Sequence, residues 1–362
     1  MRIAYVALNR SAETLKGGVG RKIETQMRIW REWGHAAELF LPAGEIVPTD
    51  KPDSRSALEN IPPLKLVRNE AARNRAVAEM VQRVEAFQPD VIFFRFARYA
   101  PPLKRLGELA PLIVELNSND VVESYHNGKV YGGVNRLTRR SLLGQAAGFV
   151  AVSHELAEMP DFTGFGKPTT VIANGVDFRE YEPLPAPQHP APRLAMAASP
   201  GLPWNGVDKL VLLAQRCPDL AFDLVGYSAH DLAAPVPANL CLHGFVPPDE
   251  VRAVLKDADV VLGTLALHRK GMQEASPLKV REALAYNLPV VLAYRDTDLA
   301  GQTFAFVLQI PNNEENVVTR AEEIRQFAYQ MRGQRADREA LRGLIDQIPK
   351  EERRLAFFRQ FL

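Results

Sequence analysis

The sequence predicts an α/β fold of two doubly wound domains, and three observations support this prediction. The chain has 362 residues, of which 46% are hydrophobic and 24% charged, an ordinary globular composition and a length that suits two cores. Short apolar runs alternate with segments of helical periodicity up to about residue 310, as in parallel sheets covered by helices. The stretch from Glu182 to Pro192 is rich in proline, which predicts an extended connector between the domains.

Composition excludes several functional classes. A net charge of +1 gives no sign of a nucleic-acid partner. The two cysteines, Cys217 and Cys241, have neither metal-ligand spacing nor a disulfide framework, which fits a reducing compartment. The apolar N-terminal run is too short for a signal peptide, and no stretch approaches the roughly 20 apolar residues that span a bilayer. We therefore expect a cytoplasmic protein with at most a weak peripheral contact at the inner membrane face.

The first domain is predicted over residues 1–182. Strands are expected at 2–8, 36–41, 64–68, 90–98, 112–117, 148–153 and 170–177, and helices at 21–34, 74–87 and 135–144. The loop before the first helix contains Gly17, Gly18 and Gly20, and glycines at a helix entry let backbone amides approach a phosphate closely. A turn that requires positive φ would use the same residues.

Two strand ends and one helix of this domain carry further candidates. Arg95 and Asn117 follow apolar strands, where ligands of open α/β sheets bind, although an arginine there equally suits a neighbouring acid. The basic segment 135–144, beside Tyr125 and Tyr131, has the composition of a contact with anionic lipid headgroups or a lipid-linked acceptor. A solvated helix face explains that pattern as well.

A linker at 183–192 and a second domain at 193–335 follow. Strands are expected at 194–198, 222–226, 240–244, 260–267 and 290–293, and helices near 206–215, 248–257, 277–286 and 314–331. A final segment, 336–362, is too apolar at its end to be solvated.

The helix expected at 277–286 organises the second domain. Ser276 is a suitable N-cap, Pro277 suits the first helical position, and Asn287 with Pro289 ends the helix. The amides of Leu278 and Lys279 would face outward with the positive end of the helix dipole, a place that fits a phosphate.

Two carboxylates flank that phosphate position. Glu282, farther along the helix, is suited to accept hydrogen bonds from the two hydroxyls of a ribose. Glu274 lies in the preceding loop, nearer to whatever the phosphates carry. The alternative interpretation is an amphipathic helix on which Arg281 and Glu282 are solvated.

The pair of glutamates, followed by Ala-Leu-Ala-Tyr-Asn-Leu-Pro-Val-Val at 283–291, resembles the signature of the retaining, nucleotide-sugar-dependent glycosyltransferases of family four. That family has the GT-B fold of two facing Rossmann-like domains, and its C-terminal helix crosses back to the first domain. The glycines at 17–20 and the Asn-Gly-Val-Asp turn at 174–177 resemble it too. The resemblance covers most of residues 1–310.

The resemblance implies transfer of a sugar from a nucleoside-diphosphate sugar, such as a UDP-sugar, to a sugar, lipid-linked or other small hydroxyl acceptor, without a metal. Synthesis of cell-surface polysaccharide or glycoconjugate is the implied setting. Glu282 would hold the ribose, and the turn from Ser276 to Lys279 and the Gly17–Gly20 loop would hold the diphosphate. Glu274 would face the sugar or the forming oxocarbenium ion, and Glu274 and Lys279 are the implied catalytic residues. Arg95, Asn117 and Asn174 are the implied acceptor-side residues.

The chain departs from the family pattern at two positions. Pro200 and Asn205 stand where many members carry an arginine and a lysine that face the donor diphosphate. Lys279 is the first candidate for a replacement cation, before Arg269, Lys270 and Arg21. Two alternatives remain: a nucleotide-sugar epimerase, which requires an acid/base pair that the sequence does not reveal, and a non-catalytic protein that binds a nucleotide sugar or a partner protein.

Overall fold

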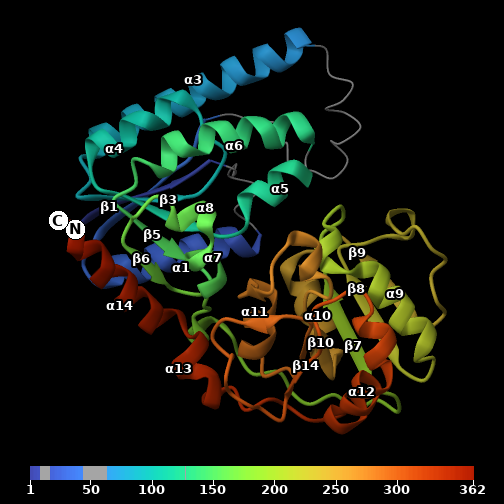
Figure 1. Ribbon diagram of the computed structural model, residues 1–362. Coiled ribbons are helices and arrows are strands. Elements are labelled where there is room, and N and C mark those ends of the chain that lie inside the picture. The colour runs from blue at the N-terminus through green and yellow to red at the C-terminus, as the bar shows by residue number, and fades with distance from the viewer. Residues whose placement is uncertain (9–16, 44–62, 127) are drawn as a thin grey trace. The chain divides into compact units, whose positions relative to one another are not determined.

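Two parallel sheets of six strands each form the framework of the protein (Figure 1). The structure is a computed structural model and describes residues 1–8, 17–43, 63–126 and 128–362. The chain divides into two compact units, one made of Met1–Ala173 with Gln347–Leu362 and the other of Asn174–Asp346. The predicted α/β class with two Rossmann-like domains is confirmed. None of the described helices combines the length and apolar character that a bilayer span requires.

The first unit is doubly wound, with the strand order β2-β1-β3-β4-β5-β6. Its strands are β1 (Arg2–Ala7), β2 (Ala36–Phe40), β3 (Val91–Arg95), β4 (Leu112–Leu116), β5 (Gly148–Ala151) and β6 (Thr169–Val171). Its helices are α1 (Gly18–Glu32), α3 (Pro63–Phe87), α4 (Leu106–Leu109), α5 (Asp120–His126), α6 (Lys129–Leu143), α7 (His154–Glu158), α8 (Pro160–Thr163) and α14 (Gln347–Phe358). Because β2 and β3 lie on opposite sides of β1, the winding reverses there, and ligands of such sheets bind at the carboxyl ends beside that reversal.

One predicted strand is wrong. The segment 64–68 is not a strand but belongs to α3, which begins at Pro63 and continues to Phe87. Proline suits the first turn of a helix because its missing amide has no intrahelical partner there. A five-residue apolar alternation is too short to separate strand from helix, whereas the buried Val77, Met80 and Val84 carry the helical period over several turns.

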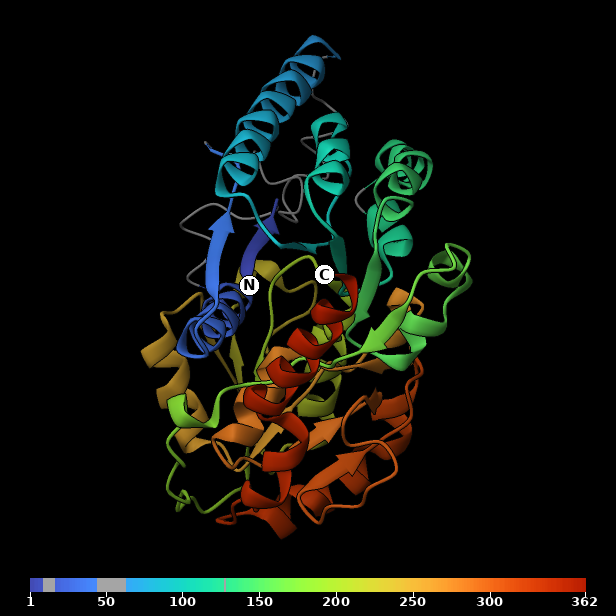
Figure 2. The ribbon, with the colours of Figure 1, turned by 90° about the vertical axis from the view of Figure 1, so that its left-hand side faces the viewer.

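The C-terminal helix α14 packs against α1 in the first unit (Figures 1 and 2). The ring of Phe358 lies 5.9 Å from that of Trp30 and 5.2 Å from that of Phe93. The indole of Trp30 donates to the Glu351 carboxylate at 2.8 Å. The end of the chain is therefore part of the first unit's core, and it enters that unit at Gln347, whereas the sequence analysis drew the boundary at residue 336.

The second unit has the strand order β14-β12-β10-β7-β8-β9. Its strands are β7 (Arg193–Ala197), β8 (Ala221–Val225), β9 (Leu240–Gly244), β10 (Val260–Leu262), β12 (Val290–Leu292) and β14 (Val307–Gln309), with a separate pair, β11 (Glu274–Ala275) and β13 (Arg295–Asp296). Its helices are α9 (Val207–Arg216), α10 (Pro248–Asp257), α11 (Leu278–Ala285), α12 (Asn316–Met331) and α13 (Arg342–Ile345). In this sheet the winding reverses between β7 and β10.

The proline-rich segment 183–192 lies inside the second unit. The Leu184 amide donates to Asn287 Oδ1 at 3.0 Å, and the Arg335 guanidinium donates to the Pro185 carbonyl at 2.6 Å. Extended backbone with few amides of its own leaves carbonyls available for such donors. The chain passes between the units at Ala173, before the Asn-Gly turn.

Candidate functional site

The helix α11 begins one residue later than the sequence suggests. Its N-cap is Pro277, in an extended conformation, and not Ser276. The amides of Val280 and Arg281 donate to the Pro277 carbonyl at 3.1 and 3.2 Å, so the amides of Leu278 and Lys279 precede the helical ladder. These two amides are at the positive end of the helix dipole.

Ser276 has a different role, because its side chain fixes the turn before α11. The Asn174 backbone amide donates to Ser276 Oγ at 3.1 Å, and the Asn174 side-chain amide donates to the Ser276 carbonyl at 2.8 Å. Asn174, predicted as an acceptor-side residue of the first domain, thus lies in the second unit and contacts the predicted donor turn.

The side chain of Arg281 is fully buried and contacts the same turn. Its guanidinium donates to both Asp296 oxygens at 2.7 and 2.8 Å, to Asp298 at 2.9 Å, and to the Asn174 carbonyl at 2.9 Å. Desolvation opposes its charge, but the two carboxylates raise its pKa above the ordinary value. The interpretation of Arg281 as a solvated residue is wrong. The Asp-Thr-Asp sequence at 296–298 was the available signal for this buried partner.

Lys279 lies at the reversal point of the second sheet. Its ammonium donates to the carbonyl of Ala197, the last residue of β7, at 2.7 Å and to Asn205 Oδ1 at 3.2 Å. The side chain is half-buried, and desolvation lowers its pKa to about 8, although the nearby Glu282 carboxylate acts in the opposite direction. An ammonium has three donors, and the described residues provide partners for two of them.

Asn205 is the residue that positions this ammonium. It is buried. Its side-chain amide donates to the Ser199 carbonyl at 3.2 Å, and its backbone carbonyl accepts from the Leu265 amide at 3.0 Å. The next residue, Gly206, has a φ of 73°, and a Cβ there would lie 2.8 Å from the Leu265 Cβ. The loops that follow β7 and β10 are therefore held together, with Lys279 between α11 and β7.

The two glutamates of the motif have different surroundings. Glu274 lies in β11, is 1% exposed, and accepts a hydrogen bond from Arg295 at 2.8 Å. Glu282 is half-buried within α11. Both residues, with Ser276, Leu278, Lys279 and Asn205, belong to the second unit, and Lys279 directly contacts Asn205.

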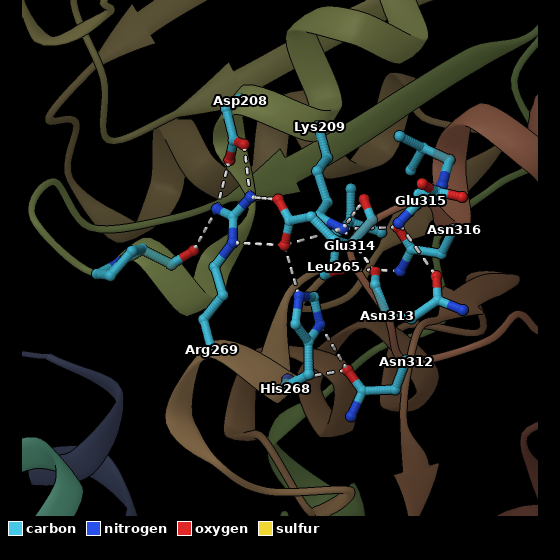
Figure 3. Close-up of polar contacts among 12 residues, drawn as sticks. Asp208, Lys209, Leu265, His268, Arg269, Asn312, Asn313, Glu314, Glu315 and Asn316 are labelled. Atoms are coloured by element: carbon cyan, nitrogen blue, oxygen red, sulfur yellow. Dashed lines mark hydrogen bonds and ion pairs between the residues drawn. The ribbon is translucent and has the colours of Figure 1, made fainter.

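Two of the other cations considered for the diphosphate, Arg269 and Lys270, are engaged elsewhere, and the third, Arg21, belongs to the first unit. Arg269 donates to both oxygens of Asp208 at 2.9 and 2.7 Å and also pairs with Glu314 (Figure 3). These hydrogen bonds raise the pKa of Arg269 above its ordinary value and neutralise its charge locally. The Lys270 ammonium lies 4.8 Å from the centre of the Trp204 ring. Lys279 is the one of these candidates that lies within α11 itself.

Lys209 lies beside Arg269 and Glu314, and no sequence pattern marked it as a functional or structural candidate. Its ammonium donates to the carbonyls of Asn313 and Glu314 and to Asn316 Oδ1, at 2.7, 2.6 and 3.0 Å (Figure 3). It is 2% exposed, and desolvation lowers its pKa. With its three donors used, Lys209 fixes the loop before α12.

In the first unit, the structure brings Arg95 and Asn117 together. Arg95 donates to Asn117 Oδ1 at 2.6 Å and to the buried Glu115 carboxylate at 3.0 Å, and Lys22 donates to the same carboxylate at 2.6 Å. Desolvation opposes the charge of Glu115, but Lys22 and Arg95 lower its pKa to about 2. Of the two alternatives for Arg95, a ligand or a neighbouring acid, the structure shows the acid, which is Glu115.

Gly17, Gly18 and Gly20 lie at the beginning of α1. Gly17 is its N-cap with a φ of −84°, and the other two are inside the helix. The interpretation that this turn requires positive φ is wrong, since none of the three has it. The preceding loop, residues 9–16, lies outside the described residues.

One cluster within the described residues has the composition of a metal site. Candidate ligand atoms of Asp223, Cys241 and His243 lie within 4.8 Å of one another. Arg193 already donates to both Asp223 oxygens, and His243 contacts one of them at 2.7 Å. A cation would have to displace this guanidinium. Cys241 is exposed, whereas the other cysteine, Cys217, is buried.

Comparison with known proteins agrees with this architecture. Residues 16–180 match the family model of Glycosyltransferase Family 4. Among curated protein sequences, none matches the chain. Sucrose-phosphate synthase from Thermosynechococcus elongatus has a similar structure, with 14% identity and a TM-score of 0.64 over 99% of this chain and 98% of that one.

Two further structures are similar over most of both chains. A lipopolysaccharide outer core galactosyltransferase has 13% identity and a TM-score of 0.63, covering 99% of this chain and 100% of that one. A UDP-GlcNAc 2-epimerase from Neisseria meningitidis has 12% identity and a TM-score of 0.53, with the same coverage. At these identities the likeness concerns the fold.

Proposed function

We propose that this chain, a family-four-like glycosyltransferase with the GT-B fold, moves a sugar from a nucleoside-diphosphate sugar to a hydroxyl acceptor with retention of the anomeric configuration. The single observation that carries the proposal is the Lys279 ammonium, held by Asn205 at the carboxyl end of β7 beside the first amides of α11.

This arrangement suits a diphosphate for three reasons. The reversal point of a doubly wound sheet is where such folds bind ligands. The amides of Leu278 and Lys279 favour an anion, and the ammonium carries a donor beyond the two used by Ala197 and Asn205. Arg269, by contrast, is ion-paired with Asp208, and the Lys270 ammonium makes a cation–π contact with the Trp204 ring.

Glu282 binds the donor ribose in this proposal. Its carboxylate is half-buried in α11 and close enough to Lys279 to act on the lysine pKa. Two ribose hydroxyls would each donate to one of its oxygens. Glu274 faces the sugar in this proposal.

The bond from the anomeric carbon to the phosphate oxygen breaks, and the acceptor oxygen forms the new bond on the same face. The acceptor proton passes to the leaving phosphate oxygen, so the reaction requires no protein base. Lys279 and the α11 amides stabilise the negative charge that develops on the diphosphate. This electrostatic stabilisation is strongest in the transition state, where that charge forms. We propose that no metal is required, that Arg95 and Asn117 serve the acceptor side, and that Asn174 contributes by holding the donor turn.

A ligand screen tests this function. Nucleoside diphosphates and their sugars are added to the purified chain, and the true donor should raise the midpoint of thermal unfolding, because a ligand at 100 times its dissociation constant adds ~2.7 kcal/mol. Glu282→Ala should erase that shift. An unchanged shift in this variant would mean that the ribose lies elsewhere.

The same donor separates the alternatives. Slow hydrolysis without acceptor, unaffected by a chelator, supports a metal-independent transferase. Binding without any turnover would indicate the non-catalytic alternative that Pro200 and Asn205 suggest. Incorporation of solvent deuterium into the sugar would indicate an epimerase, whose fold is also similar.

A further inference from the structure

Helix α6 of the first unit presents an apolar stripe that no described residue covers. Val130 is 83% exposed, Leu137 79% and Val134 42%. Their spacing of four and three residues places them on one face of the helix. Single exposed aliphatic side chains are ordinary, but three on one face form a patch, and patches of this kind mark interaction surfaces.

The opposite face of α6 is fixed in the unit, so the stripe cannot turn inward. Arg139 donates to both Asp120 oxygens at 2.8 and 2.7 Å, and Asn135 donates to the same carboxylate at 2.8 Å. A Cβ on Gly132 would lie 2.4 Å from the Tyr125 ring, which shows how closely α5 and α6 pack. Tyr125 is itself 41% exposed, next to the helix.

Cations flank the stripe. Lys129, Arg136 and Arg140 are exposed, and on a helical projection they gather on one side of the aliphatic residues. Helix α6 contains no acidic residue, although the whole chain is nearly neutral. The positive charge is therefore a local property of this surface.

We infer that α6 docks on an anionic lipid bilayer, with Val130, Val134 and Leu137 inserted among the acyl chains and the three cations at the headgroups. An amphipathic helix that lies in the interface combines an apolar face with basic flanks in this way. A solvated face does not account for aliphatic side chains exposed to this degree.

The arginines of this surface are apparent from the sequence, whereas its exposed aliphatic residues are apparent only from the structure. Arg139, one of the arginines in the basic segment, is buried and paired with Asp120. The inference does not depend on the proposed transferase activity, because no donor-site residue lies in α6.

The test is co-sedimentation of the full chain with vesicles of phosphatidylcholine alone or of phosphatidylcholine mixed equally with phosphatidylglycerol. Wild-type protein should sediment with the mixed vesicles and not with phosphatidylcholine, and added salt should release it. The triple variant Val130→Ser, Val134→Ser, Leu137→Ser should lose at least about tenfold in bound fraction, since apolar burial drives insertion. Arg136→Gln with Arg140→Gln should lose binding to a similar degree.

The control is Val318→Ser with Arg320→Gln, a similarly exposed valine and arginine on α12, which should bind like the wild type. Thermal unfolding of every variant should match the wild type, because the changed side chains are exposed. Wild-type protein that stays in solution with the mixed vesicles, or a triple variant that binds undiminished, overturns the inference. So does a concentration-dependent dimer that the triple variant abolishes without any vesicle binding, since the stripe would then serve a second copy of the chain.

Discussion

Two lysines of the second unit show how the same residue serves different purposes. Lys209 is 2% exposed and gives its three donors to the loop before α12. Lys279 is half-buried and donates to two acceptors at the reversal of the sheet. Removing Lys209 would leave three acceptors without their donor, whereas removing Lys279 would leave two, the Ala197 carbonyl and Asn205 Oδ1.

Replacement by methionine should separate these roles. Lys209→Met should lower the free energy of unfolding by about 2–4 kcal/mol, because buried unsatisfied carbonyls cost about 1–3 kcal/mol each. Lys279→Met should lower it less, by about 1–2 kcal/mol, because two acceptors instead of three lose their donor, while weakening nucleoside-diphosphate binding at least about tenfold. Urea unfolding and calorimetric titration check both effects. Equal loss of stability in the two variants would contradict the assignment of Lys279 to a ligand.

The pKa of Lys279 predicts how binding depends on pH. The ammonium, with a pKa near 8, binds an anion only when protonated, so affinity should be constant at neutral pH and fall as pH rises through about 8, by up to about tenfold per unit. Titrations with a nucleoside diphosphate between about pH 6.5 and about pH 9.5 measure this dependence of affinity on pH. In Lys279→Met the affinity for the nucleoside diphosphate should be lower and independent of pH. If the affinity of this variant still fell with rising pH, the titrating group would be another residue.

At the scale of elements, α11 depends on how it ends as well as on how it begins. Asn287 has a φ of 60°, and the amides of Asn287 and Leu288 donate to the carbonyls of Leu284 and Ala283 at 3.0 and 2.9 Å, which forms a Schellman end. The Asn287 side chain then receives the Leu184 amide. One residue thereby ends the helix and fixes the proline-rich segment to it.

Two substitutions at Asn287 should differ in a predictable way. Asn287→Ala loses the hydrogen bond and strains a left-handed residue, which together cost about 1–3 kcal/mol. Asn287→Gly loses only the hydrogen bond and should be about 1 kcal/mol more stable than the alanine variant. Chemical unfolding of the two variants makes the comparison. If they were equally stable, the backbone conformation would not be what holds this end.

At the scale of the whole molecule, each unit has its own sheet and core, and the last residues of the chain complete the first core. Phe358 is fully buried among Trp30 and Phe93. We therefore expect two unfolding transitions in calorimetry, one for each unit.

Phe358→Ala should lower one of these transitions strongly, because deleting a buried phenylalanine costs about 3–5 kcal/mol. The other transition should move little, since it belongs to the unit that lacks this residue. Leu362→Ala is the matched control, because Leu362 is 62% exposed and its loss should leave both transitions in place. Equal displacement of both transitions by Phe358→Ala would mean that the units unfold as one.

The sequence by itself determined the fold class, most strands and helices, and the motif around α11. These depend on short-range periodicity and on capping residues, both of which are properties of neighbouring positions. Asn287 with Pro289 predicted the end of the helix for that reason, and the resemblance to family-four glycosyltransferases came from the same stretch.

Only the tertiary structure decided which charged side chains have partners. Arg281 contacts Asp296 and Asn174, Arg269 contacts Asp208 and Glu314, and Lys279 contacts Asn205, over separations that no local pattern encodes. The sequence ranked Lys279 and Arg269 as candidates of one kind, and the structure separated them because one is neutralised by two carboxylates while the other faces a carbonyl and an amide. Pairing of this kind follows from how the strands order themselves in the sheet, and strand order is a property of the folded chain.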